Sequence, residues 1–328
     1  MGGDKAGFSH MNSVFSVPLG GSGLITTRLG MGCWAIGGHG WGPVRDKDSI
    51  RAIQYAFEAG CTFFDTADVY GLGHSENILR KALGEKTAQS VIATKGGVRW
   101  SQSGRTWRDC SPEYLGKALD QSRRRLGLDV IPLYYVHWPD GMTPVHVVIE
   151  ALDRFRKEGK IKALGVSNFN RDQLLEAVQV SRIDAVQVRF NLLDRDQALS
   201  VLPICREYGI MPVFYGALAD GILTGKFSGR ATFEQDDHRS RSADFQDRQF
   251  LDNLRIVDAI RTTEAAKTAT TGQIAIRWIL DEIEGSAVLF GAKTAEQVDE
   301  NLGSEKISLS DSDHKFISSL SSYSRRSA

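Results

Sequence analysis

The stretch from 133 to 166, LYYVHWPDGMTPVHVVIEALDRFRKEGKIKALGV, contains two apolar runs with an amphipathic segment between them. The runs 133–137 and 163–166 are short and rich in β-branched, aromatic or other apolar residues, which is typical of buried parallel strands. From 145 to 155 apolar residues recur on one helical face, and Thr143 is expected to cap the start of that helix. A strand, a helix and a second strand in this order predict a parallel βαβ unit.

Six further runs of the same kind lie elsewhere in the chain, separated by segments with helical periodicity. They span 29–33, 62–64, 90–94, 185–188, 211–214 and 287–290. Eight strands that alternate with helices over 328 residues favour an α/β fold, the (β/α)8 TIM barrel. A doubly wound sheet is less consistent with the sequence, because no Gly-x-Gly-x-x-Gly turn follows the first run.

Three segments lie outside this alternation. Residues 15–27, with two glycines in their middle, predict an N-terminal β-hairpin. Residues 219–247 are polar and rich in Gly, Arg and Asp, so we expect a long loop over the C-terminal mouth of the barrel that could act as a lid. Residues 1–12 are expected to be a flexible leader, and residues 13–328 a single barrel domain.

Composition narrows the classes of function. Forty Lys and Arg residues balance forty Asp and Glu residues, which disfavours general nucleic-acid binding because that needs surplus cations. No apolar run approaches the roughly 18 residues of a membrane span. The cysteines Cys33, Cys61, Cys110 and Cys205 form no Cys-x-x-Cys pair, so neither a disulfide framework nor a zinc site is indicated. We expect a cytoplasmic protein without a metal.

Four polar residues lie at or near the ends of predicted strands, which is where barrel enzymes place their chemistry. Asp65, Lys95 and His137 lie directly at the ends of apolar runs, and Tyr70 lies in the loop after Asp65. Each alone is more often a structural or solvated residue, but four at one end of a barrel indicate a site.

The types of these residues suit proton transfer to an oxygen. An ammonium lowers the pKa of a neighbouring phenol from its usual value of about 10, so Lys95 could make Tyr70 a proton donor. Asp65 would hold Lys95 in place, and His137 would hydrogen-bond a substrate oxygen. This set predicts protonation of the alkoxide that forms when a carbonyl is reduced.

The chain resembles the aldo-keto reductase superfamily over nearly its whole length. Four short motifs match motifs of that family and follow one another in the same order. They are DTADVYG at 65–71, ATK at 93–95, YVHWP at 135–139 and GVSNF at 165–169. The spacing looks closer to the bacterial sugar- or inositol-type and potassium-channel-β-like branches than to the steroid-reducing branch. The resemblance implies an NADP(H)-linked reductase of an aldehyde or ketone with Tyr70 as general acid. Lys95 and Asp65 would tune that acid, and His137 would orient the carbonyl.

The resemblance also implies where the cofactor binds. The matching positions are Trp34, Asp65, Ser167, Asn168, Gln187, Tyr215, Gly216, Leu218, Gly225, Lys226, Gly291, Lys293, Gln297, Glu300 and Asn301. Ser167, Asn168 and Gln187 would hold the nicotinamide carboxamide, and Tyr215 would stack on the ring. Lys293 would meet the 2′-phosphate, which favours NADPH over NADH on grounds of charge; a solvated lysine at a helix start is the alternative reading.

Five residues are candidates to contact a small carbonyl substrate: Trp34, Trp41, Tyr70, His137 and Trp138. For the three tryptophans, ordinary packing is an equally good interpretation. The C-terminal tail, 308–328, is expected to help shape the pocket. A redox-sensing regulatory subunit that binds NADP(H) with little turnover is the alternative function, and a metal-dependent hydrolase is less consistent with the residues at the strand ends. The sequence leaves open whether the chain is a monomer or a homo-oligomer.

Overall fold

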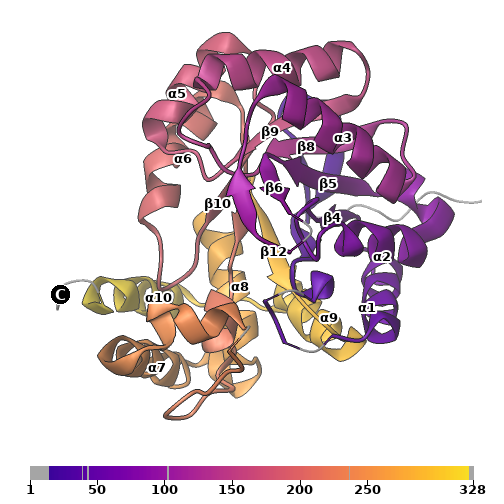
Figure 1. The fold of residues 1–328 in the computed structure, drawn as a ribbon. Coiled ribbons are helices and arrows are strands. Elements are labelled where there is room, and N and C mark those ends of the chain that lie inside the picture. Colours follow the sequence, from indigo (N-terminus) through magenta and orange to yellow (C-terminus); the bar gives the residue numbers. More distant parts are fainter. Residues whose placement is uncertain (1–14, 39, 43, 102, 236, 325–328) are drawn as a thin grey trace, which may run out of the picture.

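The computed structural model describes residues 15–324 apart from positions 39, 43, 102 and 236, so the expected leader over 1–12 lies outside the described residues. A closed barrel of eight parallel strands forms the centre of the molecule (Figure 1). In chain order the strands are β3 (Leu29–Gly32), β4 (Phe63–Asp65), β5 (Val91–Gly96), β8 (Ile131–Val136), β9 (Ile161–Ser167), β10 (Ala185–Arg189), β11 (Met211–Tyr215) and β12 (Ala287–Gly291). Each pairs with the next, and β12 closes the barrel on β3. The (β/α)8 prediction is confirmed, with every strand at its expected run.

Helices surround the barrel and bury its outer face. They are α1 (Asp46–Glu58), α2 (His74–Leu83), α3 (Pro112–Leu126), α4 (Val145–Lys157), α5 (Arg171–Val180), α6 (Asp196–Tyr208), α7 (Asp247–Ile260), α8 (Thr271–Glu282), α9 (Ala295–Leu302) and α10 (Asp311–Ser324). None of them, within the described residues, has the length and apolar character that crossing a membrane requires. Alternate strand residues divide the core: Phe64 faces the helices while Phe63 faces the barrel interior.

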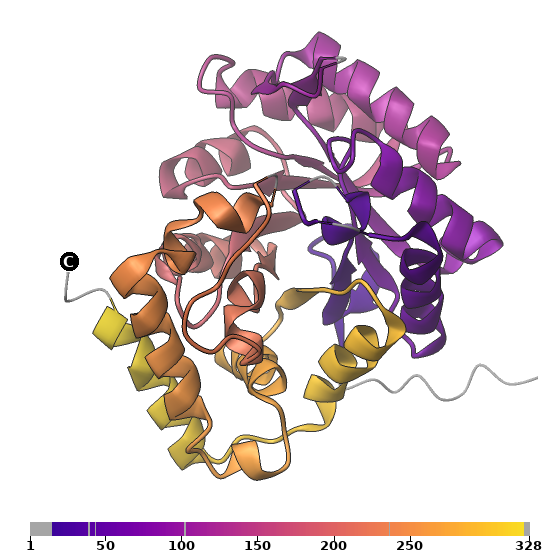
Figure 2. The same cartoon turned by 60° about the horizontal axis from the view of Figure 1, so that its bottom comes forward.

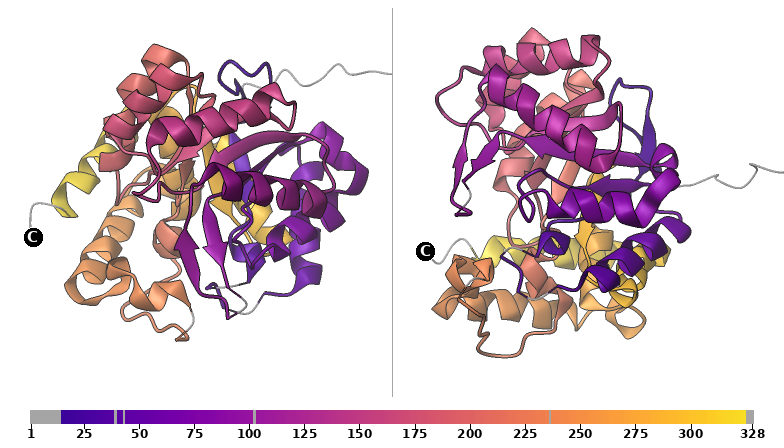
Figure 3. Two further views of the ribbon diagram at one scale, coloured as in Figure 1. Left: turned by 45° about the horizontal axis from the view of Figure 1, so that its top comes forward. Right: turned by 45° about the vertical axis from the view of Figure 1, so that its right-hand side comes forward.

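The predicted N-terminal hairpin is present and seals the amino end of the barrel. Strands β1 (Ser16–Pro18) and β2 (Ile25–Thr27) pair antiparallel, and Val17 and Leu19 are buried in the interior core of the barrel. In the right panel of Figure 3 this indigo hairpin lies on the opposite side of the molecule from the magenta hairpin after β5. The other end of the barrel is therefore the one left for a site.

The start of α4 differs from the expectation that Thr143 caps it. The helix begins at Val145 with Pro144 at the N-cap position, and no side chain caps it. The Thr143 hydroxyl instead donates to Asp140 Oδ2 at 2.8 Å, and Asp140 also accepts from the backbone N–H groups of Met142 and Thr143. The carboxylate therefore organises the turn and takes the hydroxyl that would have capped the helix.

Two features near the mouth of the barrel complete the fold. A hairpin of β6 (Val98–Trp100) and β7 (Thr106–Arg108), which the sequence did not indicate, follows β5. In the described part of the segment 219–247, the helical elements before α7 are short 3-10 turns. The segment reaches across to the loop after β3, where the His238 backbone N–H donates to the Gly40 carbonyl oxygen at 3.0 Å (Figure 2). The expected loop over the mouth is thus observed. In its described part, up to position 324, the tail does not line the cavity at the mouth: α10 packs against α7, and Trp278 Nε1 donates to Ser318 Oγ.

Candidate active site

A cavity of about 1310 Å³ opens at the carboxyl ends of the barrel strands. All five residues expected to contact substrate line it: Trp34, Trp41, Tyr70, His137 and Trp138. Of the residues expected to bind cofactor, all but Gly225 line it as well. Gly225 turns away, since its carbonyl oxygen accepts from Arg261 Nη2 at 2.7 Å.

Lys95 and Asp65 form a buried ion pair at the floor of this cavity. Lys95 is fully buried, and its Nζ donates to Asp65 Oδ1 at 2.5 Å and to the Thr66 carbonyl oxygen at 2.8 Å. The second oxygen of the carboxylate accepts from Gln187 Nε2 at 2.7 Å. Neighbouring strands supply the ion pair, because β4 ends at Asp65 and β5 carries Lys95, and Gln187 comes from β10. Both charges are thus compensated away from water.

Tyr70 and His137 lie above this ion pair and face each other. Lys95 Nζ is 5.1 Å from the centroid of the Tyr70 ring, and the rings of Tyr70 and His137 are edge to face with centroids 5.6 Å apart. Trp34 stacks on the other side of Tyr70 with a centroid separation of 6.1 Å. The structure therefore brings together the four residues that the sequence assigned to catalysis.

The protonation states are set by burial. The pKa of Tyr70 is raised well above its usual value by desolvation and then by the Asp65 charge, so the expected lowering by Lys95 is not found. Burial is the larger cause of the raised pKa, and the Lys95 ammonium beside the phenol is paired with Asp65. The pKa of His137 is lowered well below its usual range by burial and then by Lys95 and Arg108. At neutral pH the site therefore presents a protonated phenol and a neutral imidazole.

The side chains after β9 and β11 are joined by hydrogen bonds. Asn168, in the left-handed region with φ 61°, donates from Nδ2 to the His137 carbonyl oxygen and to Ser167 Oγ, both at 3.0 Å. Its Oδ1 accepts from the Tyr215 hydroxyl at 2.8 Å. The Tyr215 ring is thereby held at the cavity wall, and the Asn168 amide is occupied by protein partners.

Three cations gather at the far end of the cavity, around Lys293. Lys226, Arg239 and Lys293 all line the cavity, and the pKa of Lys226 is lowered by burial and then by the charges of the other two. Lys293 Nζ donates to the Trp41 carbonyl oxygen at 2.6 Å. The sequence reasoning named the two lysines but missed Arg239, which has no motif of its own.

The shape and donors of this cavity fit a nicotinamide dinucleotide. The cavity continues from Tyr70 and His137, past the Tyr215 ring, to Lys293 and Asn301. His137 Nδ1 is buried without a hydrogen-bond partner among the described residues. An aromatic wall near the reacting groups and cations at the other end match the flat ring and the phosphates of such a cofactor.

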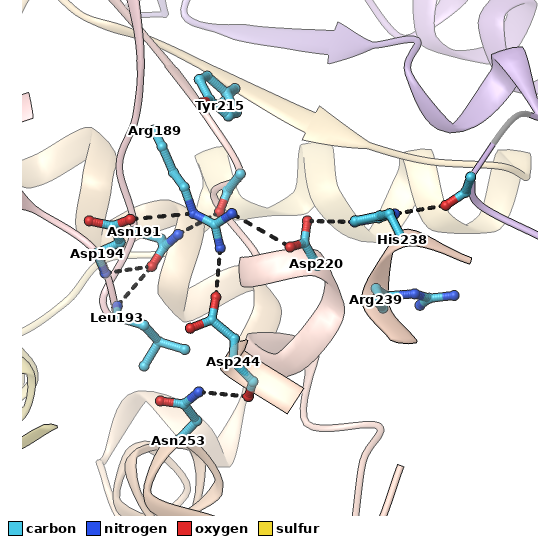
Figure 4. Close-up of polar contacts among 12 residues, drawn as sticks. Arg189, Asn191, Leu193, Asp194, Tyr215, Asp220, His238, Arg239, Asp244 and Asn253 are labelled. Carbon is cyan, nitrogen blue, oxygen red and sulfur yellow. Dashed lines mark hydrogen bonds and ion pairs between the residues drawn. The ribbon is translucent and has the colours of Figure 1, made fainter. Parts of the chain in front are cut away.

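A charge network fastens the segment 219–247 to the barrel (Figure 4). Arg189, at the end of β10, faces Asp194, Asp220 and Asp244 at 3.6, 3.6 and 3.0 Å. Asp220 lies 3.7 Å from His238 Nε2, and His238 Nδ1 lies 2.7 Å from the Gly40 carbonyl oxygen. The chain of contacts therefore crosses the mouth from β10 to the loop after β3.

Asp220 sits in this network despite an unfavourable backbone. Ala219 and Asp220 adopt φ 48° and 55°, in the left-handed region that residues other than glycine rarely occupy. The ion pairs of Asp220 offset that cost and hold the start of the segment in one conformation. Neither Arg189 nor His238 was singled out by sequence reasoning, since their partners lie far away in the chain.

Comparisons with known proteins agree with this geometry. A model of the aldo/keto reductase family matches residues 28–322. The chain is 36% identical over 283 residues to the aldo-keto reductase YhdN of Bacillus subtilis (strain 168), covering 85% of each protein. It is 32% identical over 312 residues to the NADH-specific methylglyoxal reductase of Escherichia coli (strain K12), covering 90% of this chain and 95% of that one.

A solved structure gives the same result. The glycerol dehydrogenase AKR11B4 from Gluconobacter oxydans superposes with a TM-score of 0.87 at 33% identity, covering 95% of this chain and 97% of that one. The barrel and the sequence matches lead to one conclusion. This chain belongs to the aldo/keto reductase family, the NAD(P)H-dependent carbonyl reductases.

Proposed function

We propose that this protein reduces an aldehyde or ketone to an alcohol with NADPH, and that Tyr70 is the general acid. The observation that carries the proposal is the fully buried Lys95, paired with Asp65 at 2.5 Å and 5.1 Å from the Tyr70 ring centroid. A buried ammonium with one carboxylate partner beside a phenol supports proton donation there.

In this proposal two residues act on the carbonyl oxygen of the substrate, and the others support those two residues. The neutral His137 orients the carbonyl by a hydrogen bond, and the protonated Tyr70 delivers its proton to the oxygen as negative charge develops. The cofactor, when bound, supplies the hydride to the carbonyl carbon. Lys95 stabilises the phenolate that Tyr70 becomes, and Asp65 and Gln187 keep Lys95 in place.

Ser167, Asn168 and Gln187 are proposed to face the carboxamide of the nicotinamide, with Tyr215 against its ring. Lys226, Lys293 and Arg239 are proposed to bind the phosphates. Arg239 is paired with Asp237 at 2.6 Å, so the two lysines are the charges that favour the extra dianion of NADPH over NADH. One relative is named as NADH-specific, so the two cofactors are compared directly in the test below.

The test of the reaction is NADPH oxidation followed by absorbance across a panel of aldehydes, ketones and sugars, with NADH in parallel. Tyr70→Phe should lower kcat by about 100-fold or more while the affinity for NADPH, measured by fluorescence titration, stays within about twofold. Near-normal turnover by Tyr70→Phe would refute the assignment of the acid.

The test of cofactor choice uses Lys293→Gln. The ratio of kcat/KM for NADPH over NADH should fall by about tenfold or more, because one charge-assisted contact is lost. An unchanged ratio would refute the role of Lys293. Tight NADPH binding with no turnover on any carbonyl would instead favour the regulatory alternative.

A further inference from the structure

Arg108 projects a cation into the substrate end of the cavity. It ends strand β7 and lines the cavity, where its guanidinium Cζ lies 4.7 Å from the centroid of the Trp138 ring. Its Nη1 donates to the Pro139 carbonyl oxygen at 3.3 Å. These two contacts orient the guanidinium and leave N–H donors available to a ligand.

Arg108 has no counter-ion within the described part of the chain. The neighbouring Asp109 pairs instead with Arg99 at 2.9 Å. Other cations that line the cavity or its floor are compensated: Lys95 by Asp65 and Arg189 by three aspartates. Lys226 and Lys293 lie at the opposite end, toward Arg239. The substrate end therefore carries a positive charge that no described side chain neutralises.

The position of Arg108 suits recognition of a substrate next to the reacting groups. Trp138 directly follows His137, and the Arg108 charge is among the causes that lower the pKa of His137. The rings of Trp34, Trp107 and Trp138 all line this cavity and give it flat walls. A planar body would lie against these rings with its carbonyl toward His137.

The hairpin that carries Arg108 is held by several contacts. Arg99 lies over the rings of Trp107 and Tyr114 at 5.3 and 5.1 Å, and the Tyr114 hydroxyl donates to the Val98 carbonyl oxygen at 3.0 Å. The Cys110 N–H, just beyond Arg108, donates to Asp140 Oδ2 at 2.7 Å. These contacts hold the hairpin, and therefore the Arg108 guanidinium, in position.

We propose that this enzyme selects carbonyl compounds that also carry a carboxylate, and that Arg108 is the specificity-determining residue; the inference rests on the proposed reductase function. A guanidinium fork binds a carboxylate through two parallel N–H···O contacts, which a neutral ester cannot match. The flat walls favour a planar acid, such as a carboxylated aromatic aldehyde. The reaction is unchanged: the carbonyl gains a hydride and a proton, and the carboxylate is a spectator.

The experiment compares 4-carboxybenzaldehyde with its neutral methyl ester. The ratio of kcat/KM for the acid over the ester is measured for the wild type, Arg108→Gln and Arg105→Gln. Arg105 is the matched control, since it is an exposed arginine on the same hairpin that does not line the cavity. The two aldehydes differ in intrinsic reactivity, and comparing their ratio between variants cancels that difference.

We expect Arg108→Gln to lower the acid-over-ester ratio by about tenfold, mainly through KM for the acid, because a charge-assisted contact is lost at an exposed residue. Arg105→Gln should leave the ratio within about twofold. Added KCl should lower the wild-type ratio and have little effect on that of Arg108→Gln. A ratio that Arg108→Gln leaves unchanged would overturn the proposal.

A binding measurement separates this inference from the proposed function. Quenching of tryptophan fluorescence by 4-(hydroxymethyl)benzoate reports carboxylate binding without turnover. Turnover of neutral aldehydes with no dependence on Arg108 in either assay would defeat the carboxylate selection alone. Binding that depends on Arg108, with no carbonyl reduced, would defeat the reductase function and keep the carboxylate site.

Discussion

The charge network around Arg189 allows a quantitative test of whether burial or distance sets the strength of an ion pair. Asp194 and Asp220 both lie 3.6 Å from the guanidinium, but their side chains are 40% and 9% exposed. Coulomb's law at that separation gives about 1 kcal/mol in water and about 4.6 kcal/mol at an effective dielectric constant of about 20. The two pairs thus share one distance and differ in the medium around them.

Double-mutant cycles measure each pair by itself. Arg189→Met is combined with Asp220→Asn and, separately, with Asp194→Asn, and the free energy of unfolding is measured in urea. We expect a coupling of about 2–3 kcal/mol for Asp220, below the Coulomb value because Arg189 retains some contact with solvent. For the exposed Asp194 we expect about 1 kcal/mol or less.

Two controls support the interpretation. Arg189→Lys keeps a charge and should retain most of the coupling to Asp220. Circular dichroism and tryptophan fluorescence must give coincident unfolding curves, because a free energy of unfolding is defined only for a two-state transition. A coupling to Asp194 equal to or larger than that to Asp220 would refute the argument that burial, rather than distance, sets the strength of this network.

Three further predictions follow from contacts described by the structure. Gly165→Ala should lower the free energy of unfolding by about 1–3 kcal/mol in urea titrations, because the added Cβ would lie 2.4 Å from the Tyr135 ring inside the barrel; a neutral effect would contradict the packing. The pKa of His238 is raised, since burial is outweighed by Asp220, the Gly40 carbonyl and Asp237. Its charged form therefore stabilises the closed mouth below about pH 6.5 and loses that contribution as the pH rises through its raised pKa. NADPH affinity, measured by fluorescence from pH 6 to 8.5, should fall with rising pH, and it should fall less steeply for Asp220→Asn than for the wild type. The same pH dependence in both proteins would exclude the role of His238. All four cysteines are buried, and burial raises the pKa of Cys61 to about 11 and of Cys205 to about 12. Ellman's reagent at pH 8 should therefore label no cysteine in the native protein and four in urea. Rapid labelling of the native protein would contradict this burial.

The barrel could be predicted because each strand is a short apolar run between polar segments, a signal that is local in the sequence. The residues Asp65, Lys95 and His137 could be predicted for the same reason, since each occupies the end of such a run. The hairpin of β6 and β7 could not, because its residues are mostly polar or exposed and its stability comes from side chains such as Arg99.

Properties that depend on distant partners were missed or wrong. The phenol of Tyr70 has a raised pKa because it is buried and lies near the Asp65 charge, a fact that only the folded barrel supplies. Arg189 and His238 gain their roles from contacts across the mouth of the barrel. The Thr143 cap failed because Asp140 competes for its hydroxyl.

The hairpin that seals the amino end of the barrel has a practical consequence for handling the protein. The chain enters the described structure at this hairpin, on the side opposite the β6–β7 hairpin at the mouth (Figure 3). A surface or carrier attached to this hairpin, through a cysteine introduced at the exposed Ile25, would therefore leave the mouth facing the bulk solution. Immobilisation at the hairpin should preserve turnover, whereas attachment through a cysteine introduced into the segment 219–247 should restrict it.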